Sequence, residues 1–120
     1  MVKKNTCVFI SGQGSNLKNL IHRSRDSSFP INIKLIITNN KNSKGIFFAK
    51  RNSIPYLIVN TKYKNHENLI LQILKKNKIS LICLAGYMRI ISKDFIKKFA
   101  NNIINIHPSL LPKFKGLNTF

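Results

Sequence analysis

Asn105 and His107 carry the most informative chemistry in the sequence, within the segment INIHPSLLP. Side chains two residues apart in a strand project from the same face, so the amide and the imidazole are expected to converge. Pro108 keeps His107 out of helical geometry. An amide N–H can stabilise a carbonyl oxygen that becomes an oxyanion, and an imidazole can give or take a proton beside it. The pair predicts acyl transfer to an amine; the alternative is a core histidine near a turn asparagine.

A second candidate site is the segment GQGSN, in which Gly14, Ser15 and Asn16 follow an apolar run and begin a helical one. Glycine lets the backbone approach an anion, and free N–H groups at a helix start face it. Leu17 stands where a dinucleotide-binding fingerprint has its third glycine, and the Lys-Ser/Thr pair of a P-loop is missing. We therefore expect a monophosphate rather than a dinucleotide or ATP. The alternative is a glycine turn in which Ser15 caps the helix.

The segment AGYMRI is a third candidate, because Gly86 permits a sharp exit from the apolar run before it. Met88, Ile90 and Ile91 can line an apolar slot that suits a flat heterocycle. Arg89 can orient a carboxylate or stay solvated. The alternative for the apolar side chains is an ordinary place in the core.

These three segments need a scaffold that brings them together, and the rest of the sequence predicts one. Apolar β-branched runs alternate with polar helical stretches, which is typical of βαβ units and a parallel sheet. The expected strands are Thr6–Ser11, Ile31–Thr38, Tyr56–Val59, Leu81–Ala85 and Ile103–His107. The expected helices are Ser15–Ser24, Gly45–Asn52, Asn65–Asn77 and Lys93–Ala100, the third amphipathic through Leu69, Ile70, Ile73 and Leu74. The fold class is thus α/β, a Rossmann-like open parallel sheet with helices on both faces and ligands beyond the carboxyl ends of its strands.

Composition narrows the function classes further. The 120 residues are enough for one domain, residues 1–120, whose core needs no metal or disulfide. Cys7 and Cys83 lie in apolar runs, and no CxxC motif or His/Cys cluster predicts a metal site. We expect a cytoplasmic protein, because no apolar run approaches a membrane span and the amino-terminal stretch lacks a signal-peptide pattern.

Positive charge dominates the composition: 21 Lys and Arg stand against three acids, for a formal net charge of +18. Such a balance is typical of proteins that bind polyanions. The lysines are nevertheless spread along the whole chain, Asn and Ile are also abundant, and no interleaving of aromatic and basic residues is visible. We interpret the charge as solvated faces, with nucleic-acid binding as the alternative, and expect it to attract phosphorylated and polyglutamate-bearing substrates.

Taken in order, ISGQGSNL, LAGYMRI, NIHPSLLP and FKGLNT resemble the phosphoribosylglycinamide formyltransferase family, from about Cys7 to the last residue. The resemblance implies that a formyl group passes from 10-formyltetrahydrofolate to the amine of glycinamide ribonucleotide in purine biosynthesis, without a metal. By position it implies roles for the three segments. Gly14, Ser15 and Asn16 would hold the ribonucleotide phosphate; Met88, Arg89, Ile90 and Ile91 would border the folate; Asn105 would hold the formyl oxygen and His107 would donate the proton.

Related enzymes share the fold and have to be distinguished. Methionyl-tRNA formyltransferase is similar around the Asn-x-His and SLLP residues but lacks the GxGSN segment. Formyltetrahydrofolate deformylase usually departs from GxGSNL and from HPSLLP, whereas this chain has both. A further alternative is a truncated remnant that binds the nucleotide without catalysis.

The resemblance also implies parts that the 120 residues lack. The family continues for many tens of residues and supplies there an aspartate that polarises the histidine. We expect Asp26, Glu67 and Asp94 to lie on or beside helices away from the strand ends, so that none replaces it. A lone imidazole lacks a fixed tautomer, which predicts a large loss of rate in the isolated chain. The fifth strand would also be an exposed edge, which favours self-association or complementation by a carboxyl-terminal fragment.

Overall fold

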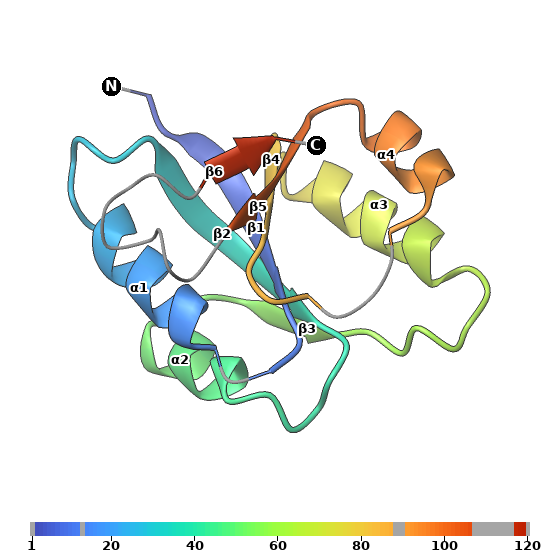
Figure 1. Cartoon of the computed structure of the whole chain (residues 1–120), viewed down its shortest axis with the longest axis horizontal. Helices are drawn as coiled ribbons and strands as arrows, with labels where there is room; N and C mark the ends of the chain where they lie inside the picture. Colours follow the sequence, from blue (N-terminus) through green and yellow to red (C-terminus); the bar gives the residue numbers. More distant parts are fainter. Residues whose placement is uncertain (1, 13, 88–90, 107–116, 120) are drawn as a thin grey trace.

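The computed structural model describes residues 2–12, 14–87, 91–106 and 117–119. Strands and helices alternate along most of the chain (Figure 1). The strands are β1 (Lys4–Ile10), β2 (Ile31–Thr38), β3 (Tyr56–Ile58), β4 (Leu81–Leu84), β5 (Asn102–Ile106) and β6 (Leu117–Thr119). The helices are α1 (Ser15–Ser24), α2 (Gly45–Arg51), α3 (His66–Lys76) and α4 (Lys93–Phe99).

One sheet joins all these strands in the order β3-β2-β1-β4-β5-β6. The first five strands are parallel to their neighbours, and β6 is antiparallel to β5. The order reverses at β1, which lies between β2 and β4. In open α/β sheets this reversal marks the place where ligands bind, beyond the carboxyl ends of the strands. The segments that follow β1, β4 and β5 therefore leave three neighbouring strands at the same end of the sheet.

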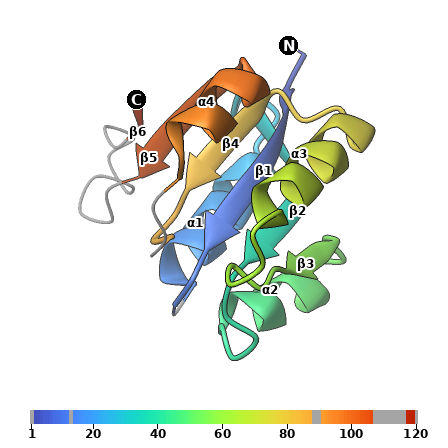
Figure 2. The same ribbon diagram turned by 90° about the vertical axis from the view of Figure 1, so that its right-hand side faces the viewer.

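Helices cover both faces of the sheet, as Figure 2 shows, with α1 and α2 on one face and α3 and α4 on the other. Along β1, Val8 and Ile10 belong to the core on the α1/α2 face, whereas Cys7 and Phe9 belong to the core on the α3/α4 face. The helices contribute Leu17, Leu20 and Ala49 to the first core, and Ile70, Leu74, Phe95 and Phe99 to the second. Burial on both faces explains why the strands are nearly continuous apolar runs in the sequence.

The predicted elements are present, with ends that differ by one or two residues. The predicted apolar face of α3 is confirmed for Ile70 and Leu74, which are buried. It is wrong for Leu69, which is 48% exposed. Leu71 packs against the core on the α3/α4 face instead. The apolar stripe of α3 is therefore rotated away from Leu69, because the helix packs against the sheet and α4 together.

The expectation that the fifth strand is an exposed edge is wrong. β6 pairs with β5 in antiparallel register, joining Ile104 to Thr119 and Ile106 to Leu117. This pairing satisfies backbone groups that β5 would otherwise present along its outer side. The sheet is parallel in its first five strands and ends in a short antiparallel strand.

The two cysteines are free thiols buried in the centre of the sheet. Cys7 belongs to the α3/α4 core and Cys83 to the α1/α2 core, so the thiols lie on opposite faces. Burial raises the pKa of Cys83 to about 12, and it raises that of Cys7 well above its ordinary value. Both residues act as small apolar side chains, as their sequence context predicts.

These buried thiols predict a loss of stability in alkaline solution. The folded state keeps both protons after the unfolded chain starts to lose them near pH 9, so stability falls as pH rises toward about 12. Each thiol contributes about 1.4 kcal/mol per pH unit within this window. Urea unfolding of the chain and of Cys83→Ala between pH 8 and 10.5 measures it. In Cys83→Ala the free energy of unfolding should fall less steeply with pH, by the contribution of one thiol. Equal pH slopes for the two proteins would contradict the prediction.

Candidate functional site

The loop after β1 enters α1 through Gly14, the N-cap residue, whose backbone is left-handed with φ 80° and ψ 11°. The helix begins at Ser15, and the amide of Lys18 donates to the carbonyl oxygen of Gly14 at 2.9 Å. The N-cap makes no side-chain hydrogen bond. The alternative in which Ser15 caps the helix is therefore wrong. A helix that starts in this way presents backbone N–H groups that an anion can satisfy.

Close packing against Gly45, the first residue of α2, explains why position 14 requires glycine. A Cβ atom on Gly14 would lie 2.8 Å from the Cα and the amide nitrogen of Gly45. A Cβ atom on Gly45 would in turn lie 2.0 Å from Cδ1 of the buried Ile10. Gly12 differs, since a Cβ atom there would have no neighbour within 4 Å. The missing side chain at Gly14 lets the two helix starts approach each other, and the missing side chain at Gly45 lets the start of α2 pack against Ile10 of β1.

Polar side chains from the loop after β2 hold the glycine loop in place. The Ser11 hydroxyl donates to Oδ1 of Asn39 at 2.7 Å, and the Asn40 side-chain amide donates to the carbonyl oxygen of Ser11 at 3.0 Å. The Ser43 hydroxyl donates to the carbonyl oxygen of Gly12 at 2.8 Å. These hydrogen bonds thus attach the loop after β1 to the loop after β2, in addition to the contact between Gly14 and Gly45.

The segment after β4 leaves the sheet through Gly86, whose φ of 77° confirms the sharp exit that the sequence predicts. Tyr87 then packs edge-on against Phe9 of β1, with ring centroids 5.2 Å apart. Ile91 is half-buried and packs against the same α3/α4 core. Met88, Arg89 and Ile90, predicted to border a folate, lie outside the described residues.

A small hollow lies next to this segment, between Phe9, Tyr87, Ile91 and the first residues of α3, His66 and Glu67. Its volume is about 10 Å³, which is room for about one water molecule. The described residues alone therefore do not form a slot for a flat heterocycle. The predicted slot stays a prediction, because it also involves Met88 and Ile90, which lie outside the described residues.

The expectation that all three acids lie away from the strand ends is wrong for Glu67. This residue is in the first turn of α3 and lines the same small hollow as Phe9 of β1. Its carboxylate accepts hydrogen bonds from the Ser92 amide at 3.0 Å and the Ser92 hydroxyl at 2.5 Å. Ser92 is the N-cap of α4 and accepts from the Phe95 amide at 3.0 Å. Glu67 thus clamps the end of the segment that begins at Gly86.

The other two acids have ordinary surface surroundings. Asp26 follows α1, and its carboxylate accepts from the amide and the hydroxyl of Ser28 at 2.9 and 2.8 Å. These two hydrogen bonds lower the pKa of Asp26 below its ordinary value. Asp94 forms an ion pair with Lys98 at 3.1 Å within α4, and both side chains are mostly exposed.

Asn105 lies in β5 next to β4, in register with Leu84. It is half-buried between Ile104 and Ile106, which both face the α1/α2 core. By strand alternation its side chain points to the α3/α4 face, where Tyr87 and Ile91 also pack. His107 lies outside the described residues, so its predicted convergence with Asn105 stays a prediction.

The candidate site thus comprises Gly14, Gly86 and Asn105, at or just beyond the carboxyl ends of the adjacent strands β1, β4 and β5. Asn16, the second residue of α1, is 9% exposed. Within residues 2–12, 14–87, 91–106 and 117–119, no three His, Cys, Asp or Glu side chains are placed to hold a metal ion. Over the same residues, no helix has the length and apolar character of a membrane span.

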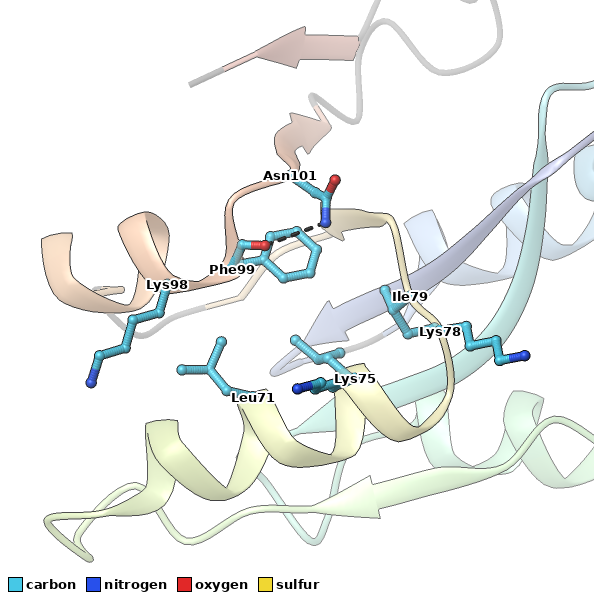
Figure 3. Close-up of a pocket in the computed structure, with 8 residues that line it drawn as sticks. Leu71, Lys75, Lys78, Ile79, Lys98, Phe99 and Asn101 are labelled. Atoms are coloured by element: carbon cyan, nitrogen blue, oxygen red, sulfur yellow. Dashed lines mark hydrogen bonds between the residues drawn. The ribbon is translucent and has the colours of Figure 1, made fainter.

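A larger hollow of about 510 Å³ lies at the opposite end of the sheet, between the carboxyl-terminal halves of α3 and α4 (Figure 3). It is bordered by Lys78 and Ile79, which precede β4, and by Asn101, which precedes β5. It therefore opens at the amino ends of these strands and does not belong to the candidate site.

The sequence pattern of the family described as "Formyl transferase" matches residues 4–120. This chain belongs to that family. Because the match covers every described strand and helix, the glycine loop, the Gly86 exit and Asn105 all lie within the family domain.

Relatives with more specific names are also similar to this formyl transferase domain. It is 42% identical over 120 residues to the human "Trifunctional purine biosynthetic protein adenosine-3", covering 97% of this chain and 12% of that protein. It is 40% identical over 121 residues to "Phosphoribosylglycinamide formyltransferase" of Haemophilus influenzae, covering 98% of this chain and 57% of the relative. The crystal structure of phosphoribosylglycinamide formyltransferase from Brucella melitensis superimposes with a TM-score of 0.83 at 37% identity, over 95% of this chain and 62% of that one.

The chain therefore spans less than two thirds of the length of each of these relatives. The structural match confirms the predicted fold class, a Rossmann-like α/β sheet with helices on both faces. What the complete relatives bind and catalyse comes to this chain as a proposal.

Sequence reasoning missed two features of the site. The first is the contact of Gly45 with Gly14: the turn-like NNKNSK predicts that a helix starts at Gly45 but not which residue it meets. The second is the contact between Glu67 and Ser92, which are 25 residues apart. No local pattern announces that contact, because it depends on how α3 and α4 pack together.

The glycine contact predicts a sharp difference between two alanine substitutions. Gly14→Ala combines a left-handed backbone with a clash against the α2 backbone, so it should lower the free energy of unfolding by about 2–4 kcal/mol. Gly12→Ala is the matched control and should change it by less than about 0.5 kcal/mol. Urea unfolding of both variants measures the difference. Similar stabilities would show that the two helix starts do not depend on this contact.

The Glu67 clamp predicts a local effect near α4. Glu67→Gln removes the charge that accepts both hydrogen bonds from Ser92, so the free energy of unfolding should fall by about 1 kcal/mol and the amides of Ser92 and Phe95 should exchange faster. Hydrogen exchange followed by NMR measures this. Asp94→Asn breaks an exposed pair and should cost less than about 0.5 kcal/mol. Unchanged exchange at Ser92 in Glu67→Gln would exclude the clamp.

Proposed function

We propose that this chain is the amino-terminal part of a phosphoribosylglycinamide formyltransferase, and that residues 1–120 form one domain of it. The complete enzyme transfers a formyl group from 10-formyltetrahydrofolate to the amine of glycinamide ribonucleotide. The observation that carries the proposal is the placement of Gly14, Gly86 and Asn105 at three adjacent strand ends of a fold shared with proteins of that name. Each of these residues comes from one of the three segments that the reaction needs.

The names of the relatives favour this reaction over those of the related formyltransferase and deformylase enzymes. Both the Haemophilus influenzae and the Brucella melitensis proteins are named for transfer to phosphoribosylglycinamide. The glycine loop supports the same choice, because a cradle for one phosphate suits a ribonucleotide. A methionyl-tRNA formyltransferase or a formyltetrahydrofolate deformylase has no need of that cradle.

The ribonucleotide phosphate binds where α1 begins. Gly14, Ser15 and Asn16 hold it through backbone N–H groups of the first turn and through the polar side chains of Ser15 and Asn16. The helix starts at the left-handed N-cap Gly14, and the positive end of the helix dipole favours the negative charge. The contact with Gly45 keeps the helix start in this position.

The folate binds along the segment after β4. Met88, Arg89, Ile90 and Ile91 border it, partly through main-chain groups. The sharp turn at Gly86 and the clamp of Glu67 on Ser92 hold the two ends of this segment. A segment held at both ends loses less conformational entropy when a ligand binds.

Catalysis is assigned to Asn105 and His107. The amine of the ribonucleotide attacks the formyl carbon, and the carbonyl oxygen becomes an oxyanion that accepts a hydrogen bond from the Asn105 amide. His107 takes part in moving the proton from the attacking amine to the nitrogen of the leaving folate. The tetrahedral intermediate then collapses. The bond between the formyl carbon and the ribonucleotide nitrogen remains, and the bond between the formyl carbon and the folate nitrogen breaks, which releases tetrahydrofolate and the formylated ribonucleotide.

The proposed mechanism also requires a carboxylate that orients His107. Glu67 is engaged with Ser92, and Asp94 pairs with Lys98, so both carboxylates have other partners. The family resemblance puts an aspartate for this role in the part of the relatives beyond the matched length. We therefore expect the 120 residues alone to be slow and to gain activity when that part is supplied.

The test is an assay of formyl transfer with both substrates. It is run on the 120 residues alone and on the same chain joined to the carboxyl-terminal part of the Haemophilus influenzae relative that follows the matched residues. The joined chain should be active, and Asn105→Ala in it should lower kcat by about 10²- to 10³-fold, the usual effect of losing one oxyanion donor.

Asn101→Ala is the matched control. Asn101 is exposed at the amino end of β5, where its side chain donates to the Phe99 carbonyl oxygen at 3.3 Å, so kcat should be unchanged. A joined chain without any transfer at high concentration would exclude the proposed reaction. Equal effects of the two Asn variants would exclude the role of Asn105.

A further inference from the structure

A third hollow lies on the α1/α2 face and has no part in the site described above. It has a volume of about 290 Å³ and lies between α1 and α2. Lys18, His22 and Arg25 border it from α1 and its end, and Phe48, Arg51 and Asn52 from α2 and its end. We call it the α1/α2 groove. We propose that the α1/α2 groove, with the exposed ring of Phe47 beside it, binds single-stranded nucleic acid.

Charge is the first argument, because the groove combines three cations with no carboxylate. Its lining contains Lys18, Arg25 and Arg51 and neither aspartate nor glutamate. The three acids of the chain are engaged elsewhere: Asp26 with Ser28, Glu67 with Ser92 and Asp94 with Lys98. The positive field of a chain with a net charge of +18 is therefore uncompensated in this groove, which suits a polyanion.

Contacts hold these cations in fixed places. The Lys18 ammonium lies 5.8 Å from the ring centroid of Phe48, and the Arg51 guanidinium lies 5.7 Å from that of Phe47. The Arg25 guanidinium donates to Oδ1 of Asn52. Cations that are already positioned lose less side-chain entropy when a phosphate binds.

An exposed aromatic ring beside partly buried ones is the second argument. Phe47 is 57% exposed and packs edge-on against Phe48, with centroids 5.8 Å apart. Further along the same face the Lys50 ammonium lies 5.9 Å from the ring centroid of Tyr56. Rings beside cations are the surface on which unpaired bases stack while their phosphates meet the charges. This surface favours a single strand over an acidic protein, which has no bases to stack.

The sequence alone did not reveal this surface. Lys18 and Arg25 come from α1, whereas Phe47, Phe48 and Arg51 come from α2, more than 20 residues later. Basic and aromatic side chains interleave only after the two helices pack side by side on the sheet. The proposal therefore gives part of the positive charge a binding role that the interpretation as solvated surface did not include.

The hollow between α3 and α4 provides a matched comparison (Figure 3). It is larger, at about 510 Å³, and is bordered by Lys75, Lys78 and Lys98. Lys78 and Lys98 point in opposite directions, and the aromatic side chain in the lining, Phe99, is 8% exposed. This hollow has as many cations as the α1/α2 groove but no exposed ring for a base.

The experiment measures binding of a fluorescent ten-nucleotide oligouridine RNA by anisotropy at 50 to 200 mM salt. The variant K18Q/R25Q/R51Q should weaken binding at least tenfold and reduce the slope of log K against log salt by about 2, since each lost phosphate contact removes about 0.7 for a single strand. The control variant K75Q/K78Q/K98Q has the same net charge and should change the slope by less than about 0.5.

Stacking is tested separately with Phe47→Ala, which leaves the net charge unchanged. It should weaken RNA binding at least fivefold but binding of inorganic polyphosphate by less than about twofold, since polyphosphate has no bases to stack and Arg51 loses only its contact with the ring. Phe47 lies outside the proposed catalytic and substrate-binding residues, so Phe47→Ala should leave formyl transfer by the joined chain unaffected. A negative result for RNA binding is therefore distinguishable from a failure of the proposed function. The proposal is overturned if both triple variants weaken binding equally, if Phe47→Ala has no effect on RNA, or if polyglutamate binds as tightly as RNA.

Discussion

Burial of β1 on both faces is the constraint on which the rest of this structure depends. Every side chain from Thr6 to Ile10 is at most 1% exposed, and the strand pairs with β2 on one side and β4 on the other. Its side chains alternate between the two cores, so each core is organised around the same strand. Because the strand order reverses at β1, the same burial also fixes where the glycine loop leaves the sheet.

The candidate site depends on backbone geometry more than on charged side chains. Two glycines with left-handed φ, Gly14 and Gly86, turn the chain away from β1 and β4. The contact of Gly14 with Gly45 ties one turn to α2, and the hydrogen bonds between Glu67 and Ser92 tie the end of the other to α3. The site is therefore held by packing between helices.

The two faces of the sheet differ in how their charge is arranged. On the α3/α4 face, Glu67 and Asp94 are bound to Ser92 and Lys98, and the lysines of the larger hollow diverge. On the α1/α2 face, the cations of the groove rest on aromatic rings or an amide. The basic residues are spread evenly along the sequence, but in the folded chain some of them gather in the groove on the α1/α2 face. Contacts between side chains, and not residue counts, decide where a cation lies.

The sequence by itself determined the order of strands and helices and the segments that follow the strand ends. Apolar runs and glycines are local signals, so Ile31–Thr38 as a strand, Ser15–Ser24 as a helix and the turn at Gly86 could be predicted. Only the tertiary structure decided that Gly45 meets Gly14, that Glu67 reaches Ser92 and that β6 covers β5. It alone also placed Lys18 on Phe48. Each of these contacts joins positions far apart in the chain, and their distance depends on how the helices and strands pack, which no local pattern encodes.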